Sequence, residues 1–534
     1  MNDQMELLPS KAIYRAGEEA HVELRGAMGE GDLTVWHFDR IVAQTHEVAD
    51  IVSVGVLPPG GYAIEWTDGT ETCRTAVQVL SASDTRLRYG FVVDYTPGRD
   101  VAGVIDNVRR LHLNALQFYD WAYRHADLTG GGDTYSDALG QPVSLETVRR
   151  MIGALHDVGS DALGYAAVYA VGGGEWEQWA HDGLLAPSGV PYGLADFLKI
   201  VDPAAPDWLE HFGTDLAVAL AELGFDGFHL DQYGYPKRAQ RADGELVDVA
   251  ASFETLISSV RDRLPHARLV FNNVNDFPTW VTAHSRQDAV YIEVWEPHTT
   301  LSSLAAVATR ARSLAGGKPV VIAAYQHVYD IADAQSADRA TALTMAALYT
   351  HGATQLLAGE ADRVLVDPYY VRNHRAGAST QALLKRWYDF ATAHDEILFA
   401  SDIHDVTGSY AGTYNGDLDV SFGTARCTEE CTAGAVWRGI RSTPQGLVVH
   451  LVNMIDQTDT LWDSPRAPIS ARPSGTLRYR ATAGTDVTIS VADPDDRGRL
   501  ITVPQTRDGD HVVALLPSLN VWQLILIAER PVQE

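Results

Sequence analysis

The sequence predicts an α/β protein in which a (β/α)8 barrel is flanked by two β-sandwiches. Between about residues 86 and 402, eight short apolar segments alternate with helical patterns, which is the order expected of a parallel barrel. The regions before and after it, 1–85 and 403–534, instead show short alternating strands separated by Gly and Pro turns. A chain of 534 residues is also too long for one hydrophobic core, which favours two to four domains.

The first 85 residues lack a strong helical period. They contain short strand patterns such as His21–Arg25, Asp32–Trp36 and Tyr62–Trp66, and a turn at Pro58–Gly61. Near-regular spacing of such strands is typical of a small antiparallel β-sandwich. We expect this region to have an architectural role.

Eight strands and the helices between them make up the predicted barrel. The strands are expected at Tyr89–Asp94, Ala115–Trp121, Ala162–Tyr169, Gly227–Tyr233, Ala267–Asn273, Ala289–Glu296, Pro319–Tyr325 and Thr354–Glu360. Helical patterns cover Val101–Leu111, Leu145–Val158, Phe253–Leu264, Thr300–Ala315 and Ala337–Leu348, and a further amphipathic helix is stopped by Gly224. The segment from Ala170 to Asp202 exceeds an ordinary loop, and we expect it to cap the active face.

The stretch Glu222–Gly234 carries a carboxylate at the end of one barrel strand. Phe228 and Leu230 point to one side of this strand, and His229 and Asp231 to the other. Because the outer face of a barrel strand packs on helices, we expect the polar side chains to point inward. The C-terminal ends of the strands are where such barrels place their chemistry. Asp231 is therefore predicted to be catalytic.

A second strand supplies a partner for Asp231. In Ala289–Pro297, Glu293 shares the inward face with Tyr291 and Trp295, near the same end of its strand. Two inward carboxylates from different strands suit the cleavage of a glycosidic bond. One attacks or stabilises the anomeric carbon, and the other protonates the leaving oxygen.

The other strand ends carry aromatic, amide and acidic side chains that suit a sugar, because hydroxyl groups need fixed donors and acceptors and C–H faces pack on rings. An isolated acidic residue at such a position more often caps a helix or pairs with an arginine. The predicted substrate-binding residues are Asp94, Tyr119, Asp120, Trp121, Tyr169, His229, Asn272, Asn273, Trp295, Tyr325, Gln326 and Glu360.

A final helix is expected around Gln381 to His394, after which the sequence becomes β-like again. Gly446–Asn453 and Trp522–Ile527 are its clearest strands. The region 403–534 is therefore predicted to be a second β-sandwich.

Charge and motif content exclude several classes of function. The net charge of −29 argues against nucleic acid or an anionic membrane as a partner. No apolar run approaches the roughly 20 residues that span a bilayer. The sequence has no HExxH, paired histidines, cysteine cluster, Gly-x-Ser-x-Gly elbow or dinucleotide fingerprint, so we expect no metal and no cofactor. The first residues lack the blocks of a secretory signal, which predicts a cytoplasmic protein, with secretion after signal removal as the alternative.

Four motifs follow one another along the predicted barrel, at Leu116–His125, Gly164–Tyr169, Gly224–Gly234 and Tyr291–Trp295. Together they resemble glycoside hydrolase family 66. The resemblance implies an immunoglobulin-like module at 1–85, a catalytic barrel at 86–402 and a Greek-key β-sandwich at 403–534. It also implies that Asp231 is the nucleophile and Glu293 the acid/base, the two residues that the strand alternation selects.

The family contains endo-dextranases and cycloisomaltooligosaccharide glucanotransferases. The resemblance therefore implies a retaining glycoside hydrolase for α-1,6-linked glucan, such as dextran or isomaltooligosaccharides. Secreted members carry a signal segment, and the transferases usually hold an extra carbohydrate-binding module near the end of the barrel. The sequence has neither feature, which favours hydrolysis over cyclisation. A glucanotransferase and a non-catalytic carbohydrate-binding barrel are the alternatives, and the oligomeric state stays open.

Overall fold

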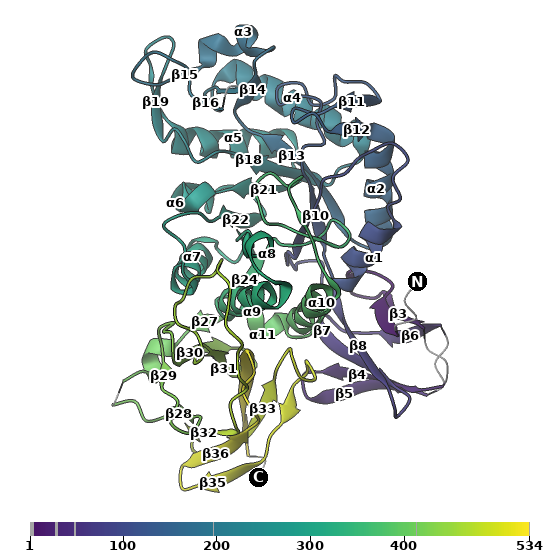
Figure 1. The fold of residues 1–534 in the computed structure, drawn as a ribbon, viewed down its shortest axis with the longest axis vertical. Helices are drawn as coiled ribbons and strands as arrows, with labels where there is room; N and C mark the ends of the chain where they lie inside the picture. Colours follow the sequence, from purple (N-terminus) through teal and green to yellow (C-terminus); the bar gives the residue numbers. More distant parts are fainter. Residues whose placement is uncertain (1–4, 27–29, 47–49, 196, 413, 533–534) are drawn as a thin grey trace.

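The computed structural model describes residues 5–26, 30–46, 50–195, 197–412 and 414–532. Its centre is an eight-stranded parallel sheet whose strands pair in chain order (Figure 1). The amide of Phe91, in the first of these strands, donates to the carbonyl of Ala358 beyond the last one at 3.3 Å, which joins the two edges. The predicted barrel is confirmed in a nearly closed form. Its strands are β9 (Tyr89–Val92), β10 (Ala115–Phe118), β13 (Asp161–Ala167), β18 (Gly227–Asp231), β21 (Arg268–Asn272), β22 (Ala289–Glu293), β23 (Val320–Ala323) and β24 (Ala353–Gln355).

Helices surround this sheet, and their ends carry recognisable signals. The side chains of Ser144, Asp248, Thr300 and Asp333 accept hydrogen bonds from backbone amides at helix N-termini. Gly224 ends its helix with a φ of 87°. The helices are α1 (Ala102–Arg110), α2 (Leu145–Asp157), α4 (Pro206–Leu223), α5 (Val249–Arg263), α7 (Leu301–Leu314), α9 (Ala334–Thr350) and α10 (Ala378–Ala393), each within a few residues of its prediction.

The barrel strands end before their predicted last residues. The largest difference is at β24, which ends at Gln355, whereas the pattern extended this strand to Glu360. Beyond β24 the backbone bends, with φ of 154° at Gly359 and 42° at Ala361. Side chains past a strand end no longer alternate between inward and outward. Several site predictions below depend on this difference.

The N-terminal region consists of two sheets packed face to face. One contains β1 (Glu6–Pro9), β3 (Glu19–Arg25) and β6 (Ile51–Val56). The other contains β2 (Tyr14–Arg15), β8 (Thr72–Leu80), β7 (Gly60–Thr67), β4 (Asp32–His37) and β5 (Arg40–Thr45). Val22 and Val52 from the first sheet and Val35 and Trp66 from the second share one buried core, as a β-sandwich requires.

The C-terminal region is a second sandwich, drawn in yellow and green at the bottom of Figure 1. Its larger sheet contains β27 (His404–Asp405), β30 (Val436–Thr443), β31 (Gly446–Asn453), β37 (Trp522–Pro531), β33 (Thr485–Ala492) and β34 (Ile501–Thr502), and β29 (Cys427–Thr428) pairs with β30. The smaller sheet contains β28 (Leu418–Ser421), β32 (Gly475–Arg480), β36 (His511–Leu516) and β35 (Gln505–Asp508). The ring of Trp522 lies 5.6 Å from that of Trp387 in α10, which attaches this sandwich to the barrel.

The segment after β13 forms a small lobe, at the top of Figure 1. It contains β14 (Ala170–Gly172), α3 (Trp176–Trp179), β15 (Leu184–Leu185), β16 (Gly193–Leu194) and β17 (Leu198–Ile200). From the loop after β18, β19 (Arg238–Arg241) and β20 (Leu246–Asp248) join it through β15. Leu194, Phe197 and Leu198 of this lobe line a cavity at the barrel mouth. The segment 170–202 therefore lies over the C-terminal ends of the barrel strands, the face that the sequence analysis expects it to cap. Among the described residues, no helix is long and apolar enough to cross a membrane.

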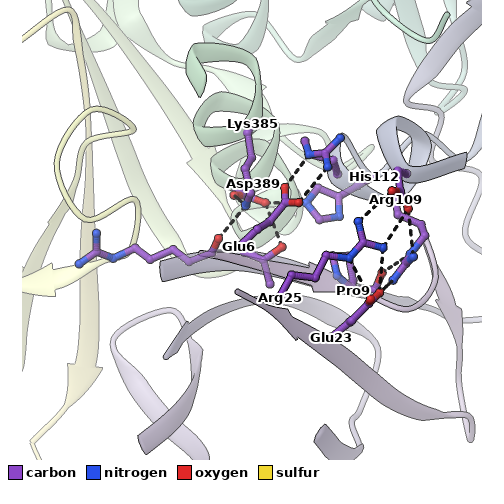
Figure 2. A network of polar contacts seen from close by, with 12 residues as sticks. Glu6, Pro9, Glu23, Arg25, Arg109, His112, Lys385 and Asp389 are labelled. Atoms are coloured by element: carbon purple, nitrogen blue, oxygen red, sulfur yellow. Dashed lines mark hydrogen bonds and ion pairs between the residues drawn. The ribbon is translucent and has the colours of Figure 1, made fainter. Parts of the chain in front are cut away.

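A buried polar network joins the N-terminal sandwich to the barrel (Figure 2). The Nε2 atom of the fully buried His112, which follows α1, lies 2.7 Å from a carboxylate oxygen of Asp389 in α10. Lys385 donates to the same carboxylate at 2.8 Å and to the carbonyl of Arg74 in β8 at 2.6 Å. The carboxylate of Asp389 therefore connects α10 to the segment after α1. Lys385 extends this connection to β8 of the N-terminal sandwich.

We expect Asp389→Ala to destabilise the chain by about 3 kcal/mol, because it leaves the buried His112 and the partly buried Lys385 without their carboxylate. The midpoint of thermal unfolding, followed by circular dichroism, measures the effect. Asp32→Ala is the control, because it removes an exposed ion pair with His46 that contributes little. Equal midpoints for the two variants would contradict this account of the network.

Candidate active site

Asp231 and Glu293 line the same cavity, at the C-terminal ends of the barrel strands. The cavity has a volume of about 290 Å³. Its walls come from the strand ends, the lobe and the loop after β24. The lining residues are Gln117, Tyr119, Asp120, His125, Leu139, Tyr165, Leu194, Phe197, Leu198, His229, Asp231, Gln232, Tyr233, Asn272, Val274, Glu293, Trp295, Tyr325, Pro368, Tyr369 and Tyr370.

Asp231 is the last residue of β18. Phe228 and Leu230 are fully buried on the other face of the strand, so the alternation directs Asp231 into the cavity. The hydroxyl of Tyr165 donates to Oδ2 at 2.8 Å, and the amide of Asn272 donates to Oδ1 at 2.7 Å. Burial raises the pKa of Asp231 to about 6, and these two hydrogen bonds act against the rise. Two neutral donors thus hold the carboxylate in one orientation.

Glu293 ends β22 in the same way and is only 8% exposed. Burial raises its pKa to about 7, and the negative charge of Asp231 adds to the rise. Polar contacts from Asn272, Tyr325 and Trp295 act in the opposite direction. The charge of Asp231 and burial together thus favour the protonated form of Glu293.

Asn272 fixes the spacing between the two acids. Its amide nitrogen donates to Oδ1 of Asp231 at 2.7 Å and to Oε2 of Glu293 at 2.8 Å. Because both bonds share one nitrogen, these two carboxylate oxygens lie at most about 5.5 Å apart. One group can therefore act on an atom from one side while the other delivers a proton to its neighbour.

Aromatic rings form much of the cavity wall. Tyr119 stacks on Tyr370 with centroids 4.3 Å apart, and Trp295 and Tyr325 lie 5.8 Å apart. Such rings pack well against the C–H faces of a sugar, while their hydroxyl groups meet its oxygens. Among the lining residues that the structure describes, none is lysine or arginine, so the cavity offers little to a phosphate.

Two further predicted residues lie in the cavity. His229 forms part of its floor, where its Nδ1 lies 3.3 Å from the hydroxyl of Tyr89 and burial lowers its pKa to about 3. The ring is therefore neutral near pH 7. Asp120 follows β10 with a φ of 46°, a backbone conformation that side-chain-bearing residues rarely adopt. Strain of this kind is concentrated at functional sites.

Six predicted substrate-binding residues lie outside the cavity lining. Asp94 has a 48% exposed side chain and accepts hydrogen bonds from Thr96. Glu360, in the loop beyond β24, pairs with Arg99, which lies between β9 and α1. This is the role that an isolated acidic residue has most often, and it follows from the early end of β24.

The other four are buried in the scaffold. Trp121 donates to the carbonyl of Tyr165 at 3.1 Å, and Tyr169 donates to the carbonyl of Tyr235 at 2.7 Å. The amide of Asn273 donates to the carbonyl of Tyr291 at 2.9 Å, and the side-chain oxygen of Gln326 accepts from the hydroxyl of Thr341 at 3.2 Å. All four follow the last residue of their strand, where the backbone has already turned.

The sequence analysis missed several lining residues. Tyr165, which holds Asp231, lies opposite the inward-facing His229 in the register of β13 and β18, so the same alternation could have identified it. Tyr370 and Phe197 lie on loops that have no periodic pattern, and only the folded chain brings them to the cavity. His125 lies on the loop after β10, within a motif noted above, and burial lowers its pKa to about 4.

A resident metal finds no ready set of ligands in this site. Within the described ranges of the chain, no three or more His, Cys, Asp or Glu side chains are grouped to hold a metal ion.

Comparison with known proteins gives concordant results. The model of glycosyl hydrolase family 66 matches residues 10–526. A cycloisomaltooligosaccharide glucanotransferase of Niallia circulans is 21% identical over 96% of this chain and 71% of its own length. A dextranase of Streptococcus salivarius is 29% identical over 18% of this chain and 12% of its own length.

Among solved structures, a cycloisomaltooligosaccharide glucanotransferase of Paenibacillus sp., complexed with cycloisomaltoheptaose, has the same fold. The TM-score is 0.87 at 19% identity, and the match covers 98% of this chain and 100% of that one. Since the family model spans almost all of the sequence, the chain belongs to glycosyl hydrolase family 66 and is an enzyme of the glycosidase class.

Proposed function

We propose that this enzyme is a retaining glycoside hydrolase that cleaves α-1,6-glucosidic bonds in dextran or isomaltooligosaccharides. The observation that carries the proposal is the single Asn272 nitrogen that bonds both acids. It keeps their nearest oxygens within about 5.5 Å, whereas an inverting pair stands roughly 6.5–9.5 Å apart. Such a short spacing favours direct attack by the Asp231 carboxylate over attack by a water molecule held between Asp231 and the sugar.

The proposed reaction has two steps. Asp231 attacks the anomeric carbon, the bond to the leaving oxygen breaks, and Glu293 transfers its proton to that oxygen. Glu293, now a carboxylate, takes a proton from water, whose oxygen attacks the anomeric carbon and releases Asp231. The raised pKa of Glu293 supports both of its roles.

The substrate assignment rests on similarity and on the cavity. The dextranase relative acts on dextran by its name, and the solved relative was crystallised with cycloisomaltoheptaose. The aromatic walls and the paired acids of this chain suit a neutral glucan.

A glucanotransferase is the second candidate, because the relative that aligns with most of this chain carries that name. It would use the same glycosyl-enzyme and pass the sugar to a hydroxyl group instead of water. Incubation with a panel of glucans of different linkage, followed by chromatography, tests both functions. Linear short sugars from α-1,6 substrates support hydrolysis, rings or longer chains support transfer, and cleavage of other linkages alone would contradict the substrate assignment.

Asp231→Ala is expected to reduce turnover of dextran by at least about 10³-fold with the fold intact, because the nucleophile is lost. Reducing-sugar release and circular dichroism measure the two properties. Asp94→Ala is a matched control, since Asp94 lies outside the cavity and the variant is expected to keep most of its activity. Appreciable turnover by Asp231→Ala would exclude Asp231 as the nucleophile.

The pH dependence of kcat/KM should be bell-shaped, with its maximum between pH values of about 6 and 7. Below the lower limb Asp231 is protonated and cannot attack; above the upper limb Glu293 has lost the proton that the leaving oxygen needs. Initial rates across a buffer series measure the profile. With a glycosyl fluoride, whose leaving group needs no proton, Glu293→Gln should lack the upper limb. An unchanged upper limb in that variant would refute the role of Glu293.

A further inference from the structure

A small cavity lies at the end of the barrel opposite the catalytic cavity, and we call it the basal cavity. Its volume is about 10 Å³, which is room for one particle about as large as a water molecule. The walls come from the segment before β9, the starts of β23 and β24, and α11 (Asp395–Leu398) with the residue after it. Apolar side chains such as Leu87, Val320 and Phe399 form part of these walls.

Arg88 brings a buried guanidinium group to the basal cavity. The residue is 3% exposed, and its Nε donates to the carbonyl of His112 at 2.8 Å. Its terminal nitrogens, Nη1 and Nη2, have no hydrogen-bond partner among the residues that the structure describes. Nη1 lies 3.5 Å from a carboxylate oxygen of Asp395. Because buried donors without partners are costly, these two nitrogens favour a further acceptor in the cavity.

The charges that line the basal cavity do not balance. Among its described lining residues, Asp395 is the one carboxylate, and Arg86 and Arg88 are the cations. The side chain of Asp395 is 4% exposed and accepts from Nε of Arg86 at 2.6 Å. Burial lowers the pKa of Arg88, which the charge of Asp395 opposes and the charge of Arg86 reinforces. One carboxylate thus serves two buried cations, and Arg88 is the less well paired.

Other charged groups nearby do not remove this excess. Arg312 adds a third, partly buried guanidinium group, which donates to the carbonyl of Gly352 in the cavity wall at 3.1 Å. Asp84 and Asp402 attract Arg86, but Asp402 is exposed and Asp84 is only partly buried. Water and salt screen such charges much more strongly than buried ones. A water molecule in the cavity would accept from Arg88 but leave the excess charge, whereas a monovalent anion would offset it.

We propose that the basal cavity is a binding site for a chloride-sized monovalent anion, held by the terminal nitrogens of Arg88 and by the charge of Arg86. The hydroxyl of Thr354 in β24 donates to the carbonyl of Leu87 before β9 at 3.0 Å, so the cavity lies where the first and last strands of the barrel meet. This end of a barrel serves stability rather than chemistry. The bound anion therefore stabilises the closed barrel, independently of the proposed function.

The test measures the midpoint of thermal unfolding of the full chain while sodium chloride replaces sodium gluconate at constant ionic strength. Gluconate is too large for the basal cavity, so the two salts differ in binding and not in screening. Replacement of about 0.2 M gluconate by chloride should raise the wild-type midpoint by at least about 2 °C, because a ligand of the folded chain stabilises it.

Two variants locate the chloride effect. Arg88→Gln should lose the rise in the midpoint, because it removes the guanidinium group that holds the anion. Arg480→Gln is the matched control, since this arginine is 53% exposed and pairs with Asp417 in the C-terminal sandwich. Its rise should equal that of the wild type. An equal rise in Arg88→Gln and in the wild type would place the anion elsewhere and overturn the proposal.

A second measurement needs no variant and decides the matter if Arg88→Gln does not fold. Anomalous diffraction from wild-type crystals soaked in sodium bromide should show a bromide ion within hydrogen-bond distance of Nη1 or Nη2 of Arg88. Density for water alone at this place, or a wild-type midpoint that does not respond to chloride, overturns the anion site. Either result leaves the proposed hydrolase untouched, because the catalytic cavity lies at the other end of the barrel.

Discussion

One side-chain amide sets the geometry on which this enzyme depends. Asn272 ends the strand that lies between those of Asp231 and Glu293, and it bonds both acids. The three strands are joined by backbone hydrogen bonds in a fixed register, with Leu230 opposite Phe271 and Asn272 opposite Tyr291. A shift of one residue would turn Asn272 away from the cavity. The distance between the acids is therefore a property of the sheet rather than of any loop.

Burial and hydrogen bonding act differently on the pKa values of the two acids. Both pKa values rise because the cavity walls displace water, but Asp231 receives two neutral hydrogen bonds that favour its charged form. Glu293 also receives polar contacts that favour its charged form, but the negative charge of Asp231 raises its pKa further. Since the donors are neutral, they orient Asp231 without supplying a positive charge that would also ionise Glu293. The lobe and the loop after β24 contribute to this burial, although neither carries a reacting group.

How far the sequence could predict this site depended on where each strand ended. Within the strands, the two-residue period correctly directed Asp231, Glu293, His229 and Asn272 into one cavity. Past the strand ends the period no longer applied, and Glu360 instead pairs with Arg99.

Some lining residues reach the cavity only through long-range packing, which no local sequence pattern predicts. Tyr370, on the loop after β24, packs on Tyr119, which follows β10, and the lobe brings Phe197 to the same cavity. The barrel itself was predictable because each strand and helix carries its own pattern. The arrangement of chemistry on strands and enclosure on loops has an evolutionary consequence. Changes in the length or sequence of the lobe would alter the wall of the cavity, while Asp231 and Glu293 would keep their positions because they lie on strands. Related proteins can in this way differ in the ligands that they accept while the paired carboxylates keep the same geometry.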